Sequence, residues 1–186
     1  MKKSYLYSYI RIAWIVFVSI ALISFSINVG LAQIQKVEQD SIIIAAREII
    51  AAQKYCALVT IDSLGRPDIR TMNPFPPEDD MSVWMATNSR SRKVSEIRKN
   101  PRVCLYYANH AQAIGSVVIK GTAVLIDDME EKLKRKREYW SQSFPDWKYL
   151  LLIKVIPERI EVINYKRGLY NSPETWSVPF VELKNP

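Results

Sequence analysis

The stretch Thr87-Asn88-Ser89-Arg90-Ser91-Arg92-Lys93 closes an apolar run and opens an amphipathic one. This change of pattern predicts a strand that gives way to a helix at Ser91. A helix N-terminus leaves backbone N–H groups unpaired and carries partial positive charge, so an anion is stabilised there. Arg92 and Lys93 add two full charges at the same place. The stretch therefore predicts a phosphate pocket, and a solvated basic helix start is the alternative.

Short apolar or alternating runs, separated by turn signals, extend on both sides of this stretch. The expected strands cover residues 55–61, 67–72, 81–87, 102–107, 116–126, 150–156 and 159–163. The expected helices cover residues 37–53, 91–99 and 127–140. Many strands with only three helices predict a mainly β domain, a small antiparallel Greek-key barrel with peripheral helices. The sequence contains no G-x-G-x-x-G motif or P-loop, which disfavours a doubly wound nucleotide-binding fold.

The last expected helix carries most of the chain's clustered charge. Asp127 is its expected N-cap, and the helix alternates in charge through the run Lys132-Leu133-Lys134-Arg135-Lys136-Arg137. Such a pattern most simply indicates a face exposed to water. The acidic groups at residues 78–80 and 127–128 sit at turns or helix starts, which favour Asp and Glu, so we interpret them as structural.

The first 32 of the 186 residues differ from the rest. Three cations, Lys2, Lys3 and Arg11, precede an uncharged apolar run over residues 12–27, and small residues at 30–32 suit cleavage before Gln33. The run is also close to the ~20 residues that a membrane helix needs. We therefore expect a signal peptide or an uncleaved membrane anchor over residues 1–32, and one domain over 33–186. In both cases the domain is exported, to a periplasmic or extracellular location.

The charge of the mature part bears on its partners. The formal net charge is +7, and the leader carries three cations and no acid, so residues 33–186 retain +4. General nucleic-acid binding needs an extended basic face rather than one local cluster. The charge therefore argues against nucleic-acid binding, and a membrane contact is expected only through the N-terminal segment if that segment is uncleaved.

The cysteines and the one histidine form no recognisable metal site. Cys56 and Cys104 each lie in an apolar strand-like run without metal-ligand spacing, so they are expected to be small buried hydrophobes. An oxidising compartment permits a disulfide between them only if their strands bring them together. His110 lies in an expected loop and is interpreted as incidental.

The ordered set of motifs resembles the pyridoxamine 5′-phosphate oxidase-like, FMN-binding split β-barrels. The resemblance rests on residues 65–70, on Thr87-Asn88 with Ser91-Arg92-Lys93, on residues 100–103 and 121–123, and on residues 157–161. Together these cover the chain from about residue 37 to residue 163. The resemblance implies a split barrel that forms a homodimer, with one FMN in each of two clefts at the interface.

The resemblance also implies the roles of particular residues. Arg70, Arg92 and Lys93 would meet the FMN phosphate. The remaining cofactor-binding positions are Thr87 near the phosphate and ribityl chain, Ser91 in the same motif, Thr71 and Met72 beside the flavin ring, and Ser116 where the family often has a glutamine. No catalytic residue is assigned, because the flavin itself carries the redox chemistry.

Departures from the family pattern concern the substrate. True pyridoxamine phosphate oxidases have a substrate-binding lysine five residues after the Arg70 equivalent, and here that position is Phe75. Their Arg-Leu-His-Asp-Arg run has no counterpart after Ile163, which itself stands where the family has a tryptophan near the flavin. The chain is therefore similar to the broader general-stress-protein-like branch, whose substrates vary.

Two further functions stay open at this point. The protein is expected to be an FMN-dependent oxidoreductase, with a non-catalytic flavin-binding or sensing protein as the alternative. The cofactor could also be a deazaflavin, or the chain could hold none. A haem-binding split barrel would need an axial ligand, for which His110 is the one histidine, and its loop position argues against that role.

Overall fold

Alternation of buried and exposed residues builds the first hairpin of the fold. β1 (Cys56–Ile61) buries every second side chain, and β2 (Pro67–Met72) returns beside it in antiparallel register. The turn between them places Gly65 at φ +78°, which glycine adopts without steric cost. The Asp62 carboxylate accepts two backbone hydrogen bonds within the turn, at 2.8 and 2.9 Å. The two expected strands and their turn are thus confirmed.

The computed structural model describes residues 38–183. The chain divides into two units, Met1–Ser41 and Ile42–Pro186. The expected leader over residues 1–32 lies outside the described residues, and residues 38–41 of the first unit are helical. Within the described part of the chain, no helix is long and apolar enough to span a membrane.

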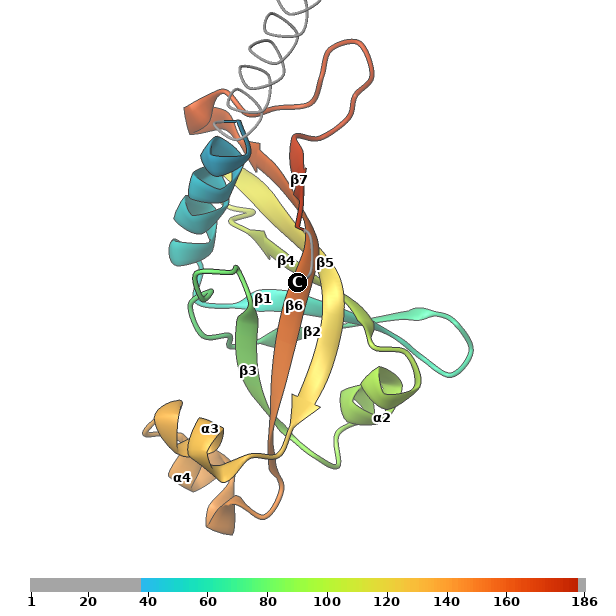
Figure 1. Ribbon diagram of the computed structural model, residues 1–186, viewed down its shortest axis with the longest axis vertical. Helices are drawn as coiled ribbons and strands as arrows, with labels where there is room; N and C mark the ends of the chain where they lie inside the picture. The colour runs from blue at the N-terminus through green and yellow to red at the C-terminus, as the bar shows by residue number, and fades with distance from the viewer. Residues whose placement is uncertain (1–37, 184–186) are drawn as a thin grey trace, which may run out of the picture. The chain divides into compact units, whose positions relative to one another are not determined.

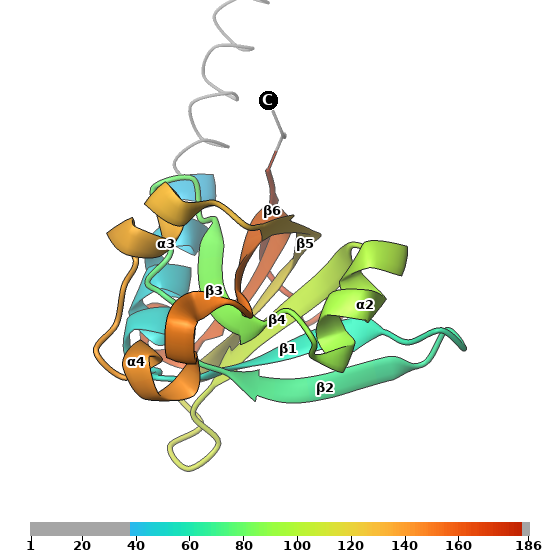
Figure 2. The ribbon, with the colours of Figure 1, turned by 90° about the horizontal axis from the view of Figure 1, so that it is seen from below.

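One antiparallel sheet of seven strands organises the second unit (Figures 1 and 2). Its strand order is β2-β1-β4-β5-β6-β3, and β7 pairs with β6. The strands after the first hairpin are β3 (Val83–Asn88), β4 (Arg102–Ala108), β5 (Gly115–Ile126), β6 (Leu150–Asn164) and β7 (Phe180–Glu182). The helices are residues 42–51, α2 (Arg92–Lys99), α3 (Met129–Lys134) and α4 (Trp140–Ser143), with 3-10 turns at Pro145–Trp147 and Tyr165–Arg167. The mainly β, antiparallel split-barrel architecture is therefore confirmed.

The long strand β6 corrects one expectation. Residues 150–156 and 159–163 were expected to be separate strands, but β6 runs without a break past Pro157. The pairing register with β5 shifts between Lys120 and Gly121, which leaves room for a residue that cannot donate a ladder hydrogen bond. A Cβ on Gly121 would lie 2.1 Å from the Ile156 carbonyl oxygen, so the bulge requires glycine there.

The two faces of β1, β2, β4 and β5 have different surroundings. The inner face carries the core, with Leu58, Leu105 and Ile119 fully buried. The alternate residues, which point to the opposite side of the sheet, are half-buried or exposed. We call this side the outer face, and its side chains are Ala57, Val59, Ile69, Thr71, Cys104, Tyr106, Ser116 and Val118. Helix 42–51 packs Ala45, Ala46 and Ile49 into the same core as the inner face.

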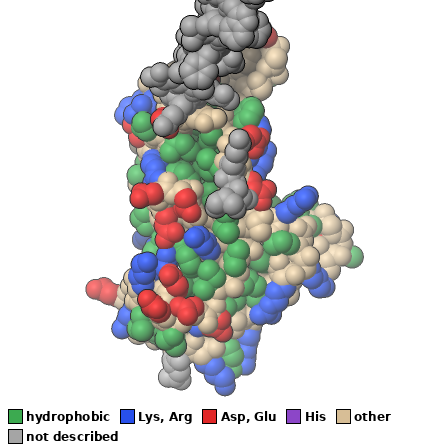
Figure 3. Space-filling view, viewed as in Figure 1, with side chains coloured by type: hydrophobic (Ala, Val, Ile, Leu, Met, Phe, Trp, Pro, Cys, Tyr) green, Lys and Arg blue, Asp and Glu red, His purple; other side chains and the backbone are tan. Residues whose placement is uncertain are grey.

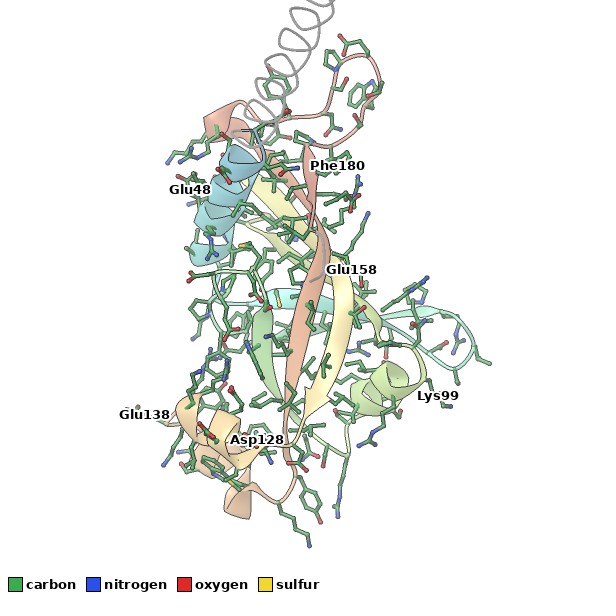
Figure 4. All side chains as sticks on the ribbon, viewed as in Figure 1. Glu48, Lys99, Asp128, Glu138, Glu158 and Phe180 are labelled. Carbon is green, nitrogen blue, oxygen red and sulfur yellow. The ribbon has the colours of Figure 1, made fainter. Side chains whose placement is uncertain are left out.

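The charged segment after β5 differs most from its expectation. Instead of one helix over residues 127–140, α3 ends at Lys134 and α4 begins at Trp140. The N-cap is Asp128 rather than Asp127, because its carboxylate accepts the Glu131 N–H at 2.8 Å. Figure 4 labels Asp128 where α3 begins.

Burial in α3 also reverses the expected pattern. Lys132 is buried and paired with Asp127, whereas Met129 and Leu133 are more than half exposed. Arg135, just after the helix, stacks on the Trp84 ring at 3.6 Å. Acidic and basic side chains are interspersed on the surface around this segment (Figure 3). The interpretation of the charge run as a simple wet face is therefore wrong, because two of its cations pack against the protein.

Candidate anion-binding site

A partly buried ion-pair cluster joins β1, β2 and α2. Arg70 projects from the inner face of β2 and donates to Asp68 at 2.7 Å and to Glu96 of α2 at 2.8 Å. The Thr60 hydroxyl accepts a hydrogen bond from Arg70 and donates one to Glu96. Thr60 is fully buried and Glu96 is 4% exposed, so these contacts are made away from water. Arg70 is thus fixed by three partners within the chain.

Arg92 extends this cluster from the first turn of α2. Its guanidinium pairs with Asp68 at 2.5 Å and with Glu96, four residues further along the helix, at 3.2 Å. The Arg92 side chain is 75% exposed, so its pairing is screened by water and is weak compared with that of Arg70. Desolvation raises the pKa of Asp68, but hydrogen bonding from Arg92 and the charges of both arginines outweigh it and hold this pKa below its usual range.

Lys93 occupies different surroundings on the same helical turn. Its ammonium donates to the Thr87 hydroxyl at 3.2 Å, and that hydroxyl lies 3.2 Å from the Ser91 hydroxyl. Among residues 38–183, Lys93 makes no ion pair. Its pKa is lowered, mainly because the half-buried ammonium is desolvated and secondly because Arg70 lies near it. The positive charge of Lys93 is therefore the one in this cluster that no carboxylate of the described chain neutralises directly.

The N-terminus of α2 remains open beside these groups. Ser91 is the N-cap, yet its side chain makes no capping hydrogen bond, and the first turn contains no acidic residue. The unpaired N–H groups and the positive end of the helix dipole are thus left to an external acceptor. Arg92, Asp68 and Glu96 also line a cavity of about 470 Å³ on the other side of the cluster. The arrangement suits an anion with several oxygens, held by Lys93, two hydroxyls and the helix N-terminus.

The structure brings together five of the eight expected cofactor-binding residues: Arg70, Thr87, Ser91, Arg92 and Lys93. Met72 continues the inner face of β2 but is buried in the core. Thr71 and Ser116 lie on the outer face. Ser116 pairs with Ala108, at the end of β4 remote from α2, roughly 20 Å along the strand from Arg102. Within one copy of the chain, Thr71 and Ser116 therefore do not lie together with the cluster around Arg70, Arg92 and Lys93.

Three residues of the cluster escaped the sequence reasoning: Thr60, Asp68 and Glu96. Asp68 stands two residues before Arg70 on the same strand face, and Glu96 stands four residues after Arg92 on the same helix. Both spacings place opposite charges next to each other. The pairs within β2 and within α2 could therefore have been predicted from the sequence, whereas the contact between β2 and α2 could not.

The other singled-out residues lie apart from this cluster. Both cysteines are free, and they point to opposite faces of the sheet, Cys56 inward and Cys104 outward, so they cannot pair. Burial raises the pKa of the Cys56 thiol to about 12, which makes it an inert core residue. His110 is exposed in the loop after β4, with its ring 5.9 Å from that of Tyr106. The described residues contain no cluster of three or more potential metal ligands.

The position of the family's substrate-binding lysine is apolar in this fold. Phe75 packs edge-on against Trp140, with ring centroids 6.2 Å apart, and the Arg137 guanidinium lies over the Phe75 ring, 3.9 Å from its centroid. Arg137 is itself held by the carbonyl oxygens of Asn73 and Pro74. Phe75 is thus a packing residue and offers no charge to a second phosphate.

Comparison with known proteins places this geometry in a wider group. The sequence model of one family, described as Pyridoxamine 5′-phosphate oxidase, matches residues 42–165. A search of the curated proteins finds no match. Among solved structures, a Clostridium acetobutylicum protein related to general stress protein 26 of Bacillus subtilis aligns with a TM-score of 0.62, at 17% identity, over 75% of this chain and 93% of that one. General stress protein 26 of Bacillus anthracis aligns with a TM-score of 0.59, at 21% identity, over 75% and 96%.

A heme binding protein shares the fold as well. The heme binding protein of Mycobacterium smegmatis aligns with a TM-score of 0.52, at 14% identity, over 64% of this chain and 52% of that one. At these identities the likenesses show the fold alone. The family match, which spans two thirds of the chain, is the finding that assigns membership.

Proposed function

The chain belongs to the pyridoxamine 5′-phosphate oxidase family, and on this premise we propose that it binds FMN and acts as a flavin-dependent oxidoreductase. The observation that carries the proposal is Lys93, an un-neutralised and half-buried ammonium beside two hydroxyls and an uncapped helix N-terminus. These groups suit the terminal phosphate of FMN. Bound FMN would supply hydride or electron transfer, and the residues of the chain hold and orient it.

The two arginines have different roles in this proposal. Arg70 is held by Asp68, Glu96 and Thr60, so it stays in place and adds positive potential at the site. Arg92 is exposed and its pairs are screened, so its guanidinium can exchange Asp68 for a phosphate oxygen at little free-energy cost. The carboxylates therefore keep the arginines ordered before the phosphate arrives.

A homodimer belongs to the same proposal. Ile69 on the outer face is 65% exposed, and it lies beside half-buried Val59, with Tyr106 and Val118 on the strands that follow. Such an apolar sheet face is suited to a second copy of the chain. Because Thr71 and Ser116 also lie on the outer face, a partner subunit is the means by which these residues would reach the flavin.

The substrate is proposed to be a small molecule other than pyridoxamine phosphate. Phe75, packed against Trp140, stands where true pyridoxamine phosphate oxidases have their substrate-binding lysine, and the nearby Arg137 guanidinium is held by the carbonyl oxygens of Asn73 and Pro74. We further propose that the domain is exported, from the apolar run that the sequence carries over residues 12–27. N-terminal sequencing of the protein from fractionated cells tests the export and shows whether the leader is cut.

The visible absorption spectrum tests the cofactor. The full chain is incubated with FMN, desalted and scanned, together with the Lys93→Ala and Lys99→Ala variants. The Lys99→Ala variant is the matched control, because it removes the same charge from the other, C-terminal end of α2. Figure 4 labels Lys99 there. We expect flavin bands at one per subunit in the wild type and in Lys99→Ala, and a large loss in Lys93→Ala. A colourless wild type, or a haem band instead of flavin bands, contradicts the proposal.

A further inference from the structure

Exposed aromatic side chains gather on the segment that joins β6 to β7. Four of the six exposed aromatic residues in the described part of the chain lie between residues 165 and 180: Tyr165, Tyr170, Trp176 and Phe180. Phe180 is partly covered by the Arg159 guanidinium, which lies 3.5 Å from its ring centroid. The other three are each more than half exposed, and we call them the aromatic surface. Single exposed apolar residues need no explanation, but several gathered together mark an interaction surface.

Trp176 is the most exposed of the three, although it lies in a closed turn. Its side chain is 76% exposed. Its backbone N–H donates to the Ser172 carbonyl oxygen at 2.8 Å, and the Ser172 N–H donates to the Ser177 carbonyl oxygen at 2.9 Å. Its φ of +56° lies in the left-handed region that bulky residues rarely adopt. The turn therefore holds the indole ring in water through a strained backbone, which is typical of functional positions.

The aromatic surface lies at the end of the second unit where helix 42–51 begins. The Arg167 guanidinium donates two hydrogen bonds to the Glu48 carboxylate, at 2.6 and 2.5 Å, which ties the start of the segment to this helix. Figure 1 shows the segment and the start of the helix at the same end, and Figure 4 labels Glu48 near it and Glu138 at the opposite end. Ile44, which is half exposed, adds an apolar side chain from the helix.

The charges around this surface cancel. Lys166 and Arg167 are balanced by Glu48 and Glu174. Attraction to a strongly charged partner is therefore not what this end of the molecule offers. Tyrosine and tryptophan combine an apolar ring with a polar O–H or N–H group, and such rings gather where a bilayer meets water. The composition of the surface is thus that of a contact with phospholipid at the level of the headgroups.

The chain itself supplies a means of holding this end near a bilayer. The apolar run over residues 12–27 is close to the length of a membrane helix. Residues 28–37 separate the run from the first described residue, and even fully extended they reach at most about 35 Å. The chain then enters the second unit at Ile42, in the first turn of helix 42–51. An uncut leader would therefore tether the domain by the end that carries the aromatic surface.

We propose that Tyr165, Tyr170 and Trp176 dock the domain on the surface of the phospholipid bilayer that holds the leader. The three rings enter the headgroup region, and the closed turn keeps Trp176 in position for this contact. The inference rests on the proposed export, with the leader retained as an anchor, and does not depend on flavin binding.

Quenching of tryptophan fluorescence by brominated lipid tests the docking. The full chain is reconstituted in phosphatidylcholine vesicles, with and without lipid brominated near the headgroup end of an acyl chain. The emission lost in a Trp→Phe variant isolates one of the five tryptophans. We expect brominated lipid to quench at least half of the emission that Trp176→Phe removes. The matched control is Trp147→Phe, because Trp147 precedes β6 whereas the aromatic surface follows it, and we expect its emission to be unchanged.

Changes to the tyrosines and to the salt concentration test the chemistry of the contact. The double variant Tyr165→Ser, Tyr170→Ser should reduce the quenching of Trp176 at least twofold. Tyr139→Ser, which removes an exposed tyrosine beside Glu138 at the opposite end, should leave it unchanged. High salt should also leave it unchanged, because the charges around the surface cancel. Loss of the quenching in high salt, or an equal effect of Tyr139→Ser, would contradict docking by the aromatic surface.

Trp14, within the apolar run, distinguishes the docking from the anchor on which it rests. The emission that Trp14→Phe removes should be quenched if the leader lies in the bilayer. Quenching of Trp14 without quenching of Trp176, or equal quenching of Trp147 and Trp176, overturns the docking and leaves the anchor standing. Absence of Trp14 quenching overturns the anchor and with it the docking, and neither result alters the flavin proposal.

Discussion

The N-termini of α2 and α3 show opposite solutions to the same physical problem. Both helices are short and rich in charge. α3 is capped by Asp128 and has Glu130 and Glu131 in its first turn, so its own acids satisfy the positive end. α2 has no acid in its first turn and no side-chain cap, and Arg92 and Lys93 add to the positive charge instead.

The difference explains why one end is suited to a ligand and the other is not. An N-terminus that is satisfied within the chain gains nothing from an anion, whereas the α2 end is incomplete without one. The acid that α2 does contain, Glu96, is one turn further along and serves Arg70 and Thr60. α2 therefore uses its carboxylate to fix the arginines and leaves its N-terminus open.

Removing one carboxylate from each helix, Glu96 from α2 and Glu131 from α3, should give the largest difference in stability between the two helices. Glu96→Ala leaves Arg70 and the buried Thr60 hydroxyl without their shared partner, so we expect a loss of about 3 kcal/mol in the free energy of unfolding. Glu131→Ala is the control on α3, because Arg135 keeps its second partner, Glu78. We expect a loss of about 1 kcal/mol or less there. Urea denaturation measures both, and equal losses would contradict the comparison.

Replacing the N-cap residue of each helix should give a smaller difference in stability. Asp128→Ala removes the hydrogen bond to the Glu131 N–H, so we expect about 1 kcal/mol of lost stability. Ser91→Ala removes a side chain that makes no such bond, and we expect a loss below about 0.5 kcal/mol. Thermal unfolding at neutral pH checks the difference. A loss for Ser91→Ala as large as that for Asp128→Ala would show that α2 depends on its own cap.

The pH dependence of FMN binding should give the smallest effect. The pKa of Lys93 is lowered from 10.5 in the folded protein, so its charge is lost as pH rises through that lower value. FMN affinity should therefore fall within a window that ends near pH 10.5. Over the same window the folded ligand-free chain binds fewer protons than the unfolded chain, so the stability contribution of this group rises with pH.

Lys93→Arg provides the control for this titration, because arginine keeps its charge throughout the window. In that variant we expect neither the fall in affinity nor the rise in stability. Parallel fluorescence titrations and urea denaturation between pH 7 and 10 measure both quantities. If affinity falls equally in the wild type and in Lys93→Arg, the titrating group is not Lys93.

The parts of the fold that the sequence predicts well are those with a simple period. Alternation in residues 56–61 and 67–72, with glycine at the turn, predicts the first hairpin correctly. The segment after β5 was mispredicted because Lys132 and Arg135 pack inside by contacts with Asp127, Glu78 and Trp84. Charge counts cannot show such burial, since it depends on which aromatic ring the fold brings near.

The site was predictable to a similar extent. Basic residues at 92–93 after a strand and Arg70 on a neighbouring strand indicate an anion, and the fold brings these three together. The neutralising partners Asp68 and Glu96 were missed, because their roles depend on how α2 packs on β1 and β2. That Ser116 lies remote from the cluster also follows only from the strand register.

The central claim is that Lys93 and the open N-terminus of α2 bind a phosphate group. The dissociation constants of FMN and riboflavin, which differ by that phosphate, measure it directly in the wild type, Lys93→Ala and Lys99→Ala. We predict that the wild type and Lys99→Ala prefer FMN by about 10- to 100-fold, as for charged hydrogen bonds. We predict that Lys93→Ala loses most of this preference. Equal affinity of the wild type for both flavins, or an undiminished preference in Lys93→Ala, would contradict the claim.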